Sequence, residues 1–381
     1  MSGPRGVGEP LRIYDTPRRE VVPFEGGELV TLYTCGITPY DATHLGHAAT
    51  FVTYDVLQRR LRDRGHDTRC VRNITDVDDP LLVKANELSI HYLDLAAAEV
   101  ARFDDDMKAL GQLPVYAEPR ATSAIAEIRK VVAELIDTSF AYAVDGWVYF
   151  DVSSYPAYGS LSHYDHETML RLSAERGGDP GDTRKRNPLD FVLWRPSEDG
   201  EPAWESLWGP GRPGWHIECT ALARRELETD TVDIHGGGGD LIFPHHESSA
   251  AQSACLTGKP LARYWMHQAM VRMDGHKMSK SLGNMVFVSD LRDEWDPMAI
   301  RLTLLAEHYR TPWEWHDKRM AEATARLERW SEAGDGDGGL DAVRRALDDD
   351  LDTPAAVAAV DAAATEGNGV SRAAALLGVR T

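Results

Sequence analysis

The sequence predicts an α/β fold in which a helix connects two parallel strands. Residues 29–35 (LVTLYTC) form a short apolar run that is typical of a buried strand. Residues 44–64 carry apolar side chains at helical spacings, and Gly65 is a natural stop for that helix. Residues 68–74 predict a second strand. This strand–helix–strand order indicates a parallel sheet with a right-handed crossover.

Ligands of such sheets bind beyond the carboxyl ends of the strands, so three segments are expected to lie together at one ligand-binding edge of the sheet. Cys35 ends the first strand, the HLGH segment at 44–47 begins the helix, and residues 73–76 end the second strand. Residues 231–235 predict another strand of the sheet, and four glycines follow it at 236–239. Such a run lets a backbone approach a ligand closely, although it is often only a flexible loop.

The rest of the chain predicts an insertion followed by a helical end. The expected elements of the insertion are helices over 93–139, a short strand over 147–152 and a loop-rich stretch over 155–214. The expected elements of the end are helices after 296, a glycine- and aspartate-rich linker over 331–339 and an alanine-rich helical tail over 340–381.

The composition is that of a globular protein with more than one domain. The chain has 381 residues, of which 43% are hydrophobic and 27% charged, and domains run to roughly 100–200 residues each. We expect neither a membrane helix nor a secretory signal, because the chain has no long apolar run and its start is polar. The four cysteines form no close pair, which favours a reducing cytoplasm over a disulfide scaffold.

The net charge argues against a nucleic-acid partner. The chain has 41 Lys and Arg against 61 Asp and Glu, a formal charge of −20. Tight binding to nucleic acid depends on neutralisation of phosphates by Lys and Arg. A local basic patch would still be compatible with this charge.

Two short segments suit the binding of ATP phosphates. His44 and His47 share one face at a helix start, where backbone N–H groups and the helix dipole favour an anion, and Gly46 leaves room for a flat purine. Lys277 and Lys280 are two of only eight lysines and form a cationic loop that can close over a triphosphate. Taken alone, each segment also fits a non-functional alternative. His44 and His47 could be surface histidines near a helix cap, and Lys277 and Lys280 could lie in an ordinary exposed loop.

Cys35, Cys219 and His245 are candidate zinc ligands. Their separations of 184 and 26 positions match no finger-type pattern. Buried free cysteines are an ordinary alternative. Context favours the metal, because Cys35 ends a strand at the expected ligand-binding edge and His245 follows the glycine run.

The HLGH and KMSKS segments together are the paired signatures of class I aminoacyl-tRNA synthetases. Residues 33–41 (YTCGITPYD), 214–219 (GWHIEC) and 233–247 (DIHGGGGDLIFPHHE) closely resemble cysteinyl-tRNA synthetases, and the resemblance covers about residues 28–320. It implies a class I synthetase-type Rossmann (HUP) parallel sheet with an inserted connective domain and a C-terminal helical bundle. It also implies one zinc ion on Cys35, Cys219 and His245, with the thiolate of the substrate cysteine bound to the metal.

Two departures from the synthetase pattern point to a relative with another acceptor. Ser249 stands where the HHENE pattern has a further zinc-binding glutamate, and the chain lacks the length of the usual anticodon-binding domain. Residues 331–381 hold ten acidic and four basic side chains, a poor surface for tRNA. These departures, with residues 35–47 and 175–180, resemble the mycothiol-pathway cysteine ligases, which join cysteine to the amine of glucosaminyl-inositol (GlcN-Ins).

The resemblance implies a two-step ligase that forms cysteinyl-adenylate from ATP, with Mg²⁺, and then the amide. The residues that hold the phosphates would be His44, His47, Lys277 and Lys280. The substrate and adenylate contacts would be Cys35, Gly36, Ile37, Thr38, Thr50, Asn73, Ile74, Thr75, Trp215, Gly237, Gly238, Gly239 and Val271. No general base is evident, and Asp240 is a guess. The expected partners are L-cysteine, ATP and GlcN-Ins, bound by a cytoplasmic monomer without nucleic acid or membrane.

The expected division is a split Rossmann catalytic domain over 1–110 and 210–275, a connective insertion over 111–209, a stem-contact segment with the KMSKS loop over 276–316 and a C-terminal helical region over 317–381. Two other functions stay open. One is a truncated cysteinyl-tRNA synthetase, and the other is a non-catalytic, synthetase-like binding module.

Overall fold

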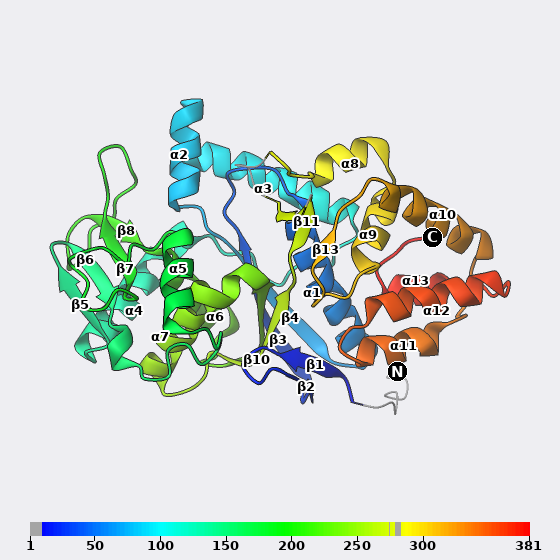
Figure 1. Ribbon diagram of the computed structural model, residues 1–381, viewed down its shortest axis with the longest axis horizontal. Coiled ribbons are helices and arrows are strands. Elements are labelled where there is room, and N and C mark those ends of the chain that lie inside the picture. The colour runs from blue at the N-terminus through cyan, green and yellow to red at the C-terminus, as the bar shows by residue number, and fades with distance from the viewer. Residues whose placement is uncertain (1–9, 274, 279–282) are drawn as a thin grey trace.

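A four-stranded parallel sheet forms the centre of the molecule (Figure 1). The computed structural model describes residues 10–273, 275–278 and 283–381. The strand order is β10-β9-β3-β4, and all neighbouring strands are parallel. The strands are β3 (Leu29–Ile37), β4 (Asp67–Ile74), β9 (Val232–Gly238) and β10 (Ala262–Gln268). The predicted α/β class is confirmed.

Helices cover both faces of this sheet. Helix α1 (Leu45–Asp63) joins β3 to β4 on one face, as its apolar spacing predicts, and Gly65 ends it with φ of 92°. Helices α6 (Trp215–Leu227) and α7 (Glu247–Thr257) lie on the insertion side of the sheet (Figure 1). The carboxyl ends of the strands remain accessible between these two layers.

The insertion is an antiparallel sheet with its own helices. Its strand order is β5-β6-β7-β8. The elements are α4 (Ile125–Asp137), β5 (Ala141–Val144), β6 (Trp147–Phe150), α5 (His166–Glu175), β7 (Phe191–Pro196) and β8 (Gly211–Pro213). The stretch 155–214 is loop-rich as predicted, but it also contains α5, β7 and β8, which the prediction did not include. Elements of three to ten residues are too short to show a clear apolar period.

The helices predicted over 93–139 are present as α3 (Tyr92–Ala109) and α4, and the chain between them bridges to β4 at Ala117 and Arg120. One further predicted boundary is corrected. The glycine run belongs partly to a strand, because β9 continues to Gly238. Helix α2 (Asp79–Leu88) precedes α3 and projects from the body (Figure 1).

The C-terminal part packs against α1 and shares its apolar core. It contains β11 (Val271–Met273), β12 (His276–Lys277), α8 (Val288–Glu294), α9 (Pro297–Leu305), β13 (Trp313–Glu314), α10 (Lys318–Ala333), α11 (Leu340–Asp348), α12 (Thr353–Thr365) and α13 (Ser371–Leu376). The linker begins at Gly334, three residues later than predicted, because α10 continues to Ala333. A buried ion pair between Arg301 and Asp55 ties α9 to α1.

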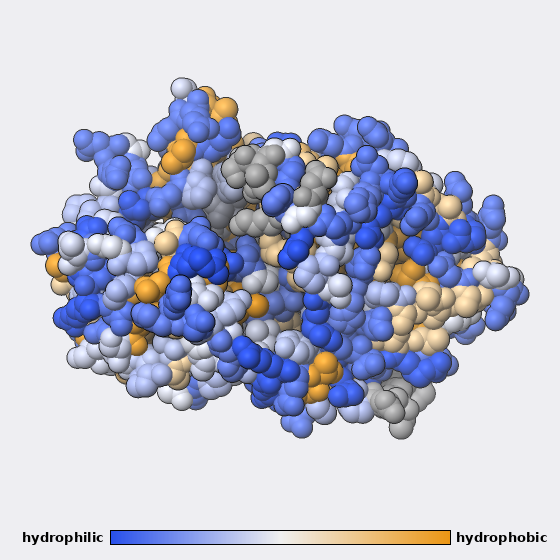
Figure 2. All heavy atoms as spheres, in the orientation of Figure 1, coloured by the Kyte–Doolittle hydropathy of each residue, from blue (hydrophilic) through white to orange (hydrophobic). Residues whose placement is uncertain are grey.

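The surface is largely hydrophilic on the face that Figure 2 shows. Exposed apolar side chains gather on and just after α2, at Val83, Leu88 and Ile90. A hairpin of β1 (Arg12–Asp15) and β2 (Glu20–Pro23) flanks β10. None of the described helices combines the length and apolar character that crossing a bilayer requires.

Candidate active site and metal cluster

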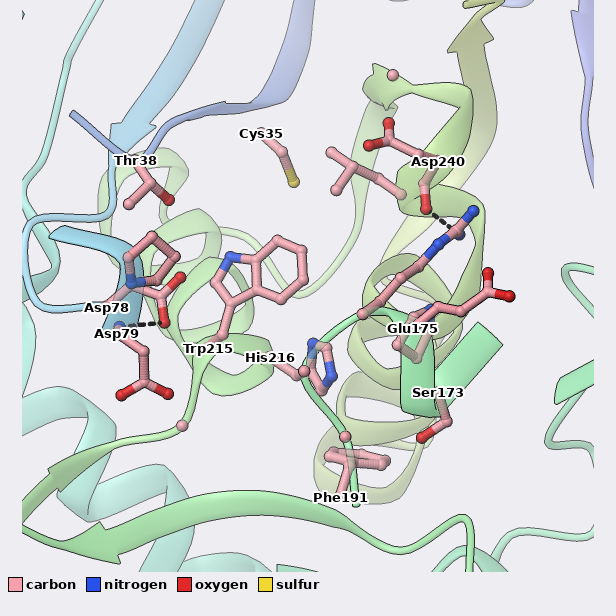
Figure 3. Close-up of a pocket in the computed structure, with 18 of the residues that line it drawn as sticks. Cys35, Thr38, Asp78, Asp79, Ser173, Glu175, Phe191, Trp215, His216 and Asp240 are labelled. Atoms are coloured by element: carbon pink, nitrogen blue, oxygen red, sulfur yellow. Dashed lines mark hydrogen bonds between the residues drawn. The ribbon is translucent and has the colours of Figure 1, made fainter. Parts of the chain in front are cut away.

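A large cavity opens at the carboxyl ends of the parallel strands (Figure 3). Its volume is about 730 Å³, which is typical of a small-molecule site. The predicted site residues that line it are Cys35, Gly36, Ile37, Thr38, His44, His47, Thr50, Trp215, Gly238 and Val271. The predicted residues that do not line it are Asn73, Ile74, Thr75, Cys219, Gly237, Gly239 and His245. Lys280 and the side chain of Lys277 lie outside the described residues.

Three predicted metal ligands from distant parts of the chain meet beside this cavity, and of the three Cys35 lines it. Cys35 lies in β3, Cys219 in α6, and His245 in the turn before α7, and all three are buried. The two sulfur atoms are 3.6 Å apart, and Nε2 of His245 lies 3.2 Å from Sγ of Cys219. The three donor atoms all lie within 4.8 Å of one another.

This donor set fits a tetrahedral zinc ion. Two thiolates with Zn–S bonds of about 2.3 Å lie about 3.7 Å apart in a tetrahedral site, close to the sulfur separation here. Burial alone would raise the pKa of Cys219, but the hydrogen bond from Cys35 and the charge of His245 lower it well below its usual value. Burial and the adjacent Cys219 raise the pKa of Cys35. The two cysteines therefore favour a state in which Cys219 is a thiolate and Cys35 a thiol before any metal binds.

A chain of histidines extends from the cluster and was not predicted. Nε2 of His246 lies 3.1 Å from Sγ of Cys35, and its Nδ1 lies 2.7 Å from Nε2 of His267. Nδ1 of His267 lies 2.7 Å from the hydroxyl of Thr16. His246, His235 and Cys35 form a second possible ligand group that shares Cys35 with the first. No sequence spacing relates these residues, because they come from separate elements.

Ser249 makes a local hydrogen bond at the position that the sequence comparison singled out. Its side chain is fully buried in α7, and its hydroxyl donates to the carbonyl oxygen of His245 at 3.0 Å. Such a bond to the residue four positions earlier is common for serine in a helix. The hydroxyl therefore stabilises the turn that carries His245.

The HLGH segment forms the start of α1, but its backbone N–H groups are not all free for an anion as the sequence predicted. His44 is the N-cap, and its Nδ1 accepts hydrogen bonds from the backbone N–H groups of Gly46 and His47. Two of the helix-start donors are therefore occupied by this imidazole. The rings of His44 and His47 are stacked, with centroids 3.8 Å apart.

Both imidazoles are neutral near pH 7. Burial lowers the pKa of His47 to about 4. Burial, and then the neighbouring charge of His47, lower the pKa of His44 well below its usual value. Because Nδ1 of His44 accepts hydrogen bonds, its proton resides on Nε2, which leaves an N–H donor for a ligand.

The glycine run is held against α1 by Tyr54. The Tyr54 hydroxyl receives the N–H of Gly237 at 2.7 Å and donates to the carbonyl oxygen of Met266 at 2.7 Å. A Cβ on Gly236 would lie 2.3 Å from the Tyr54 ring, so this position requires glycine. The run is thus a packed strand end, not a flexible loop.

Asn73 and Thr75 support the site from behind its lining. The amide oxygen of Asn73 accepts the N–H of Gly36 at 2.9 Å, and its amide nitrogen donates to the Thr75 hydroxyl. Thr75 donates to the buried carboxyl of Glu218 at 2.9 Å. Glu218 was not predicted as a site residue, and it joins β4 to the helix that carries Cys219.

The loop over 175–180 lies against the end of the glycine run. The guanidinium of Arg176 donates to the carbonyl oxygen of Asp240 (Figure 3). It also donates to the carbonyl oxygen of Phe243. The carboxylate of Asp240 is exposed on the rim of the cavity. The loop therefore positions the backbone that follows Gly239.

The fold and this site define a class I aminoacyl-tRNA synthetase catalytic domain. The family model for the tRNA synthetases class I (C) catalytic domain matches residues 21–325. The chain is similar in fold to the methionyl-tRNA synthetase of Mycobacterium tuberculosis in complex with methionyl-adenylate, with a TM-score of 0.65, 17% identity, and coverage of 89% of this chain and 82% of that chain. It is also similar to the agnB2 LeuRS of Agrobacterium radiobacter K84, with a TM-score of 0.67, 11% identity, and coverage of 93% and 83%.

Curated relatives narrow this class to one family. The L-cysteine:1D-myo-inositol 2-amino-2-deoxy-alpha-D-glucopyranoside ligase of Thermobispora bispora is 51% identical, over 96% of this chain and 93% of its own length. The ligase of the same name from Nocardiopsis dassonvillei is 49% identical, over 98% and 94%. The chain belongs to this ligase family within the class I synthetases.

Proposed function

We propose that the chain is an ATP-dependent ligase that activates L-cysteine as cysteinyl-adenylate and transfers the cysteinyl group to the amine of GlcN-Ins in mycothiol biosynthesis. The observation that carries this proposal is the identity of about half of all positions, over nearly the full length, to relatives that bear that ligase name. The Cys–Cys–His cluster beside a nucleotide-sized cavity supports it.

In the first step, the cysteine carboxylate attacks the α-phosphorus of ATP, and pyrophosphate leaves. His44 and His47 donate hydrogen bonds from the start of α1, and Lys277 and Lys280 neutralise charge that develops on the phosphates, with Mg²⁺ bound to the nucleotide. The chain contributes positioning and charge stabilisation to this step.

Cys35, Cys219 and His245 would hold one zinc ion, which supplies a thiophilic position that favours a thiolate over a hydroxyl. Two aromatic neighbours orient His245. The Trp215 indole stacks on it with centroids 4.3 Å apart, and Nδ1 of His216 lies 3.1 Å from its Nδ1. Contacts of this kind fix the orientation of a ligating imidazole.

In the second step, the neutral sugar amine attacks the acyl carbon, a C–N bond forms, and AMP leaves with its phosphate oxygen. The attacking nitrogen must lose a proton, and the exposed Asp240 carboxylate at the rim is a candidate acceptor. We further propose a cytoplasmic monomer with the four-part domain division given by the sequence and without a nucleic-acid partner.

Mass spectrometry of the products tests the proposal against its alternatives. The enzyme is supplied with ATP, cysteine and either GlcN-Ins or tRNA. We expect the cysteinyl amide of GlcN-Ins, AMP and pyrophosphate, and no charged tRNA. Charged tRNA without the amide would indicate a truncated synthetase. Absence of both products and of cysteine-dependent ATP–pyrophosphate exchange would indicate a binding module.

A further inference from the structure

One side of the cavity is a wall of charged side chains that the adenylation step does not use. We call it the insertion wall; its members are Trp147, Asp182, Arg184, Lys185, Arg195 and Arg212. They come from β6, from the loop before β7, and from β7 and β8. His44 and His47 line the same cavity from the start of α1.

The arginines of the insertion wall are engaged with carboxylates. Arg184 pairs with Asp182 at 2.8 Å, and Arg195 pairs with Asp79 at 3.0 Å. Arg212 is buried and pairs with Glu201 at 3.0 Å and with Asp79. Their charges are therefore largely balanced within the protein, and these pairs give the wall its shape.

Lys185 is different, because its ammonium group has no hydrogen bond or ion pair with any residue that the structure describes. It is half-buried and is the one lysine among the described residues that line the cavity. Burial lowers the pKa of this ammonium group, while the nearby Asp182, Asp179 and Asp190 oppose that shift. A partly desolvated ammonium group without a partner has three donors free for a ligand.

The backbone around Lys185 is held in place before any ligand binds. The buried carboxylate of Asp190 accepts the N–H groups of Arg186 and Asn187 at 3.2 and 2.9 Å, and the hydroxyl of Tyr142 at 2.7 Å. The N–H of Arg186 also donates to that hydroxyl at 2.8 Å. A side chain on a fixed backbone loses less freedom when it binds.

Lys185 also shares its cavity with residues of the metal cluster and its surroundings. Cys35 and His216 line the same cavity as Lys185. His216 adjoins the metal cluster through His245. The acyl group of a cysteine held at the cluster would therefore lie in the cavity that Lys185 lines.

We propose that the insertion wall is the acceptor subsite and that Lys185 donates hydrogen bonds to hydroxyl oxygens of the amino-sugar–inositol acceptor. This inference rests on the proposed function. A polyol offers many neutral acceptor oxygens, which match a wall whose arginine charges are balanced and which also presents the ammonium group of Lys185. The subsite also lies within the same cavity as the adenylate contacts, as amide formation requires.

The test compares Lys185→Met with the wild type, because methionine keeps the length of the side chain and removes the charge. Two activities are measured, namely cysteine-dependent ATP–pyrophosphate exchange and amide synthesis with GlcN-Ins. We expect the KM for GlcN-Ins to rise about tenfold, as for the loss of one hydrogen bond from a charged group, and exchange to stay within about twofold. Lys130→Met, on the exposed side of the insertion helix α4, is the matched control and should change neither activity.

Three results would overturn the inference, and they are distinguishable. An unchanged KM for GlcN-Ins would exclude Lys185 from the acceptor subsite while leaving the proposed function intact. Impaired exchange with an unchanged KM for GlcN-Ins would place Lys185 at the adenylate. Failure of the wild type to bind GlcN-Ins in calorimetry and to form any amide would reject the proposed function together with the subsite.

Discussion

The Sγ atoms of Cys35 and Cys219 lie 3.6 Å apart, although 184 positions separate the two residues. Cys35 sits near the end of β3, and Cys219 lies in the first half of α6, which packs on β3 and β4. The contact therefore forms only when the chain that follows the insertion returns to the sheet. His245 completes the group from the turn that follows β9.

Removal of Cys219 should empty the metal site. We expect about one zinc per chain in the wild type, on the basis of a single tetrahedral site. Cys219→Ala should lose the metal and the cysteine-dependent ATP–pyrophosphate exchange. Metal content is measured by inductively coupled plasma mass spectrometry. Cys255→Ala is the control, since this half-buried cysteine lies outside both ligand groups. Retention of zinc and activity by Cys219→Ala would remove that residue from the site.

Removal of the Ser249 hydroxyl should leave the metal in place. The hydroxyl donates to the carbonyl oxygen of His245, so Ser249→Ala should cost about 0.5–1.5 kcal/mol of unfolding free energy, the value of one hydrogen bond. Zinc content and exchange should stay near wild-type values. His245→Ala, assayed beside it, should lose both. Loss of zinc from Ser249→Ala would show that the hydroxyl belongs to the ligand set.

The buried His267 should make the protein sensitive to acid. Burial lowers the pKa of His267 from 6.5 to about 3. Between these two pH values the imidazole is protonated in the unfolded chain and neutral in the folded protein. The contribution to stability is fully present above pH 6.5 and is lost as the pH falls toward 3. One such proton changes the free energy of unfolding by about 1.4 kcal/mol per pH unit.

His267→Gln should therefore flatten the fall in stability between pH 6.5 and 4.5 by about this slope. Urea unfolding of chelator-treated protein at several pH values measures it. His316→Gln replaces an exposed imidazole and should leave the slope unchanged. An identical slope in His267→Gln and the wild type would refute the assignment.

Loss of either lysine of the KMSKS segment should slow adenylation more than it weakens cysteine binding. We expect Lys277→Met and Lys280→Met each to lower the kcat of exchange by about 100-fold or more, as for the loss of one donor that stabilises transition-state charge. The KM for cysteine should change little. Lys259→Met, whose exposed ammonium group pairs with Asp230, is the control. An unchanged kcat would contradict the proposed role.

Much of the central fold could be predicted, because its signals are local. The apolar runs of β3 and β4 and the helical spacing of α1 each lie within one stretch of chain, and the structure has all three near the predicted bounds. The elements of the insertion were harder to predict from the sequence, because α5, β7 and β8 are short and their apolar residues follow no clear period. The end of β9 was also missed, since glycines usually end strands and here Tyr54 holds them in one.

The sequence by itself determined the fold class, the family signatures and the types of residue that could bind ATP and a metal. Only the tertiary structure decided which of these residues meet. It brought Cys35, Cys219 and His245 together and placed His246 and His267 next to them. It also left the ammonium group of Lys185 on the wall of the adjacent cavity, without a partner among the residues that the structure describes. The physical reason is that such contacts depend on how separate elements pack, and packing between distant segments leaves no fixed spacing along the chain.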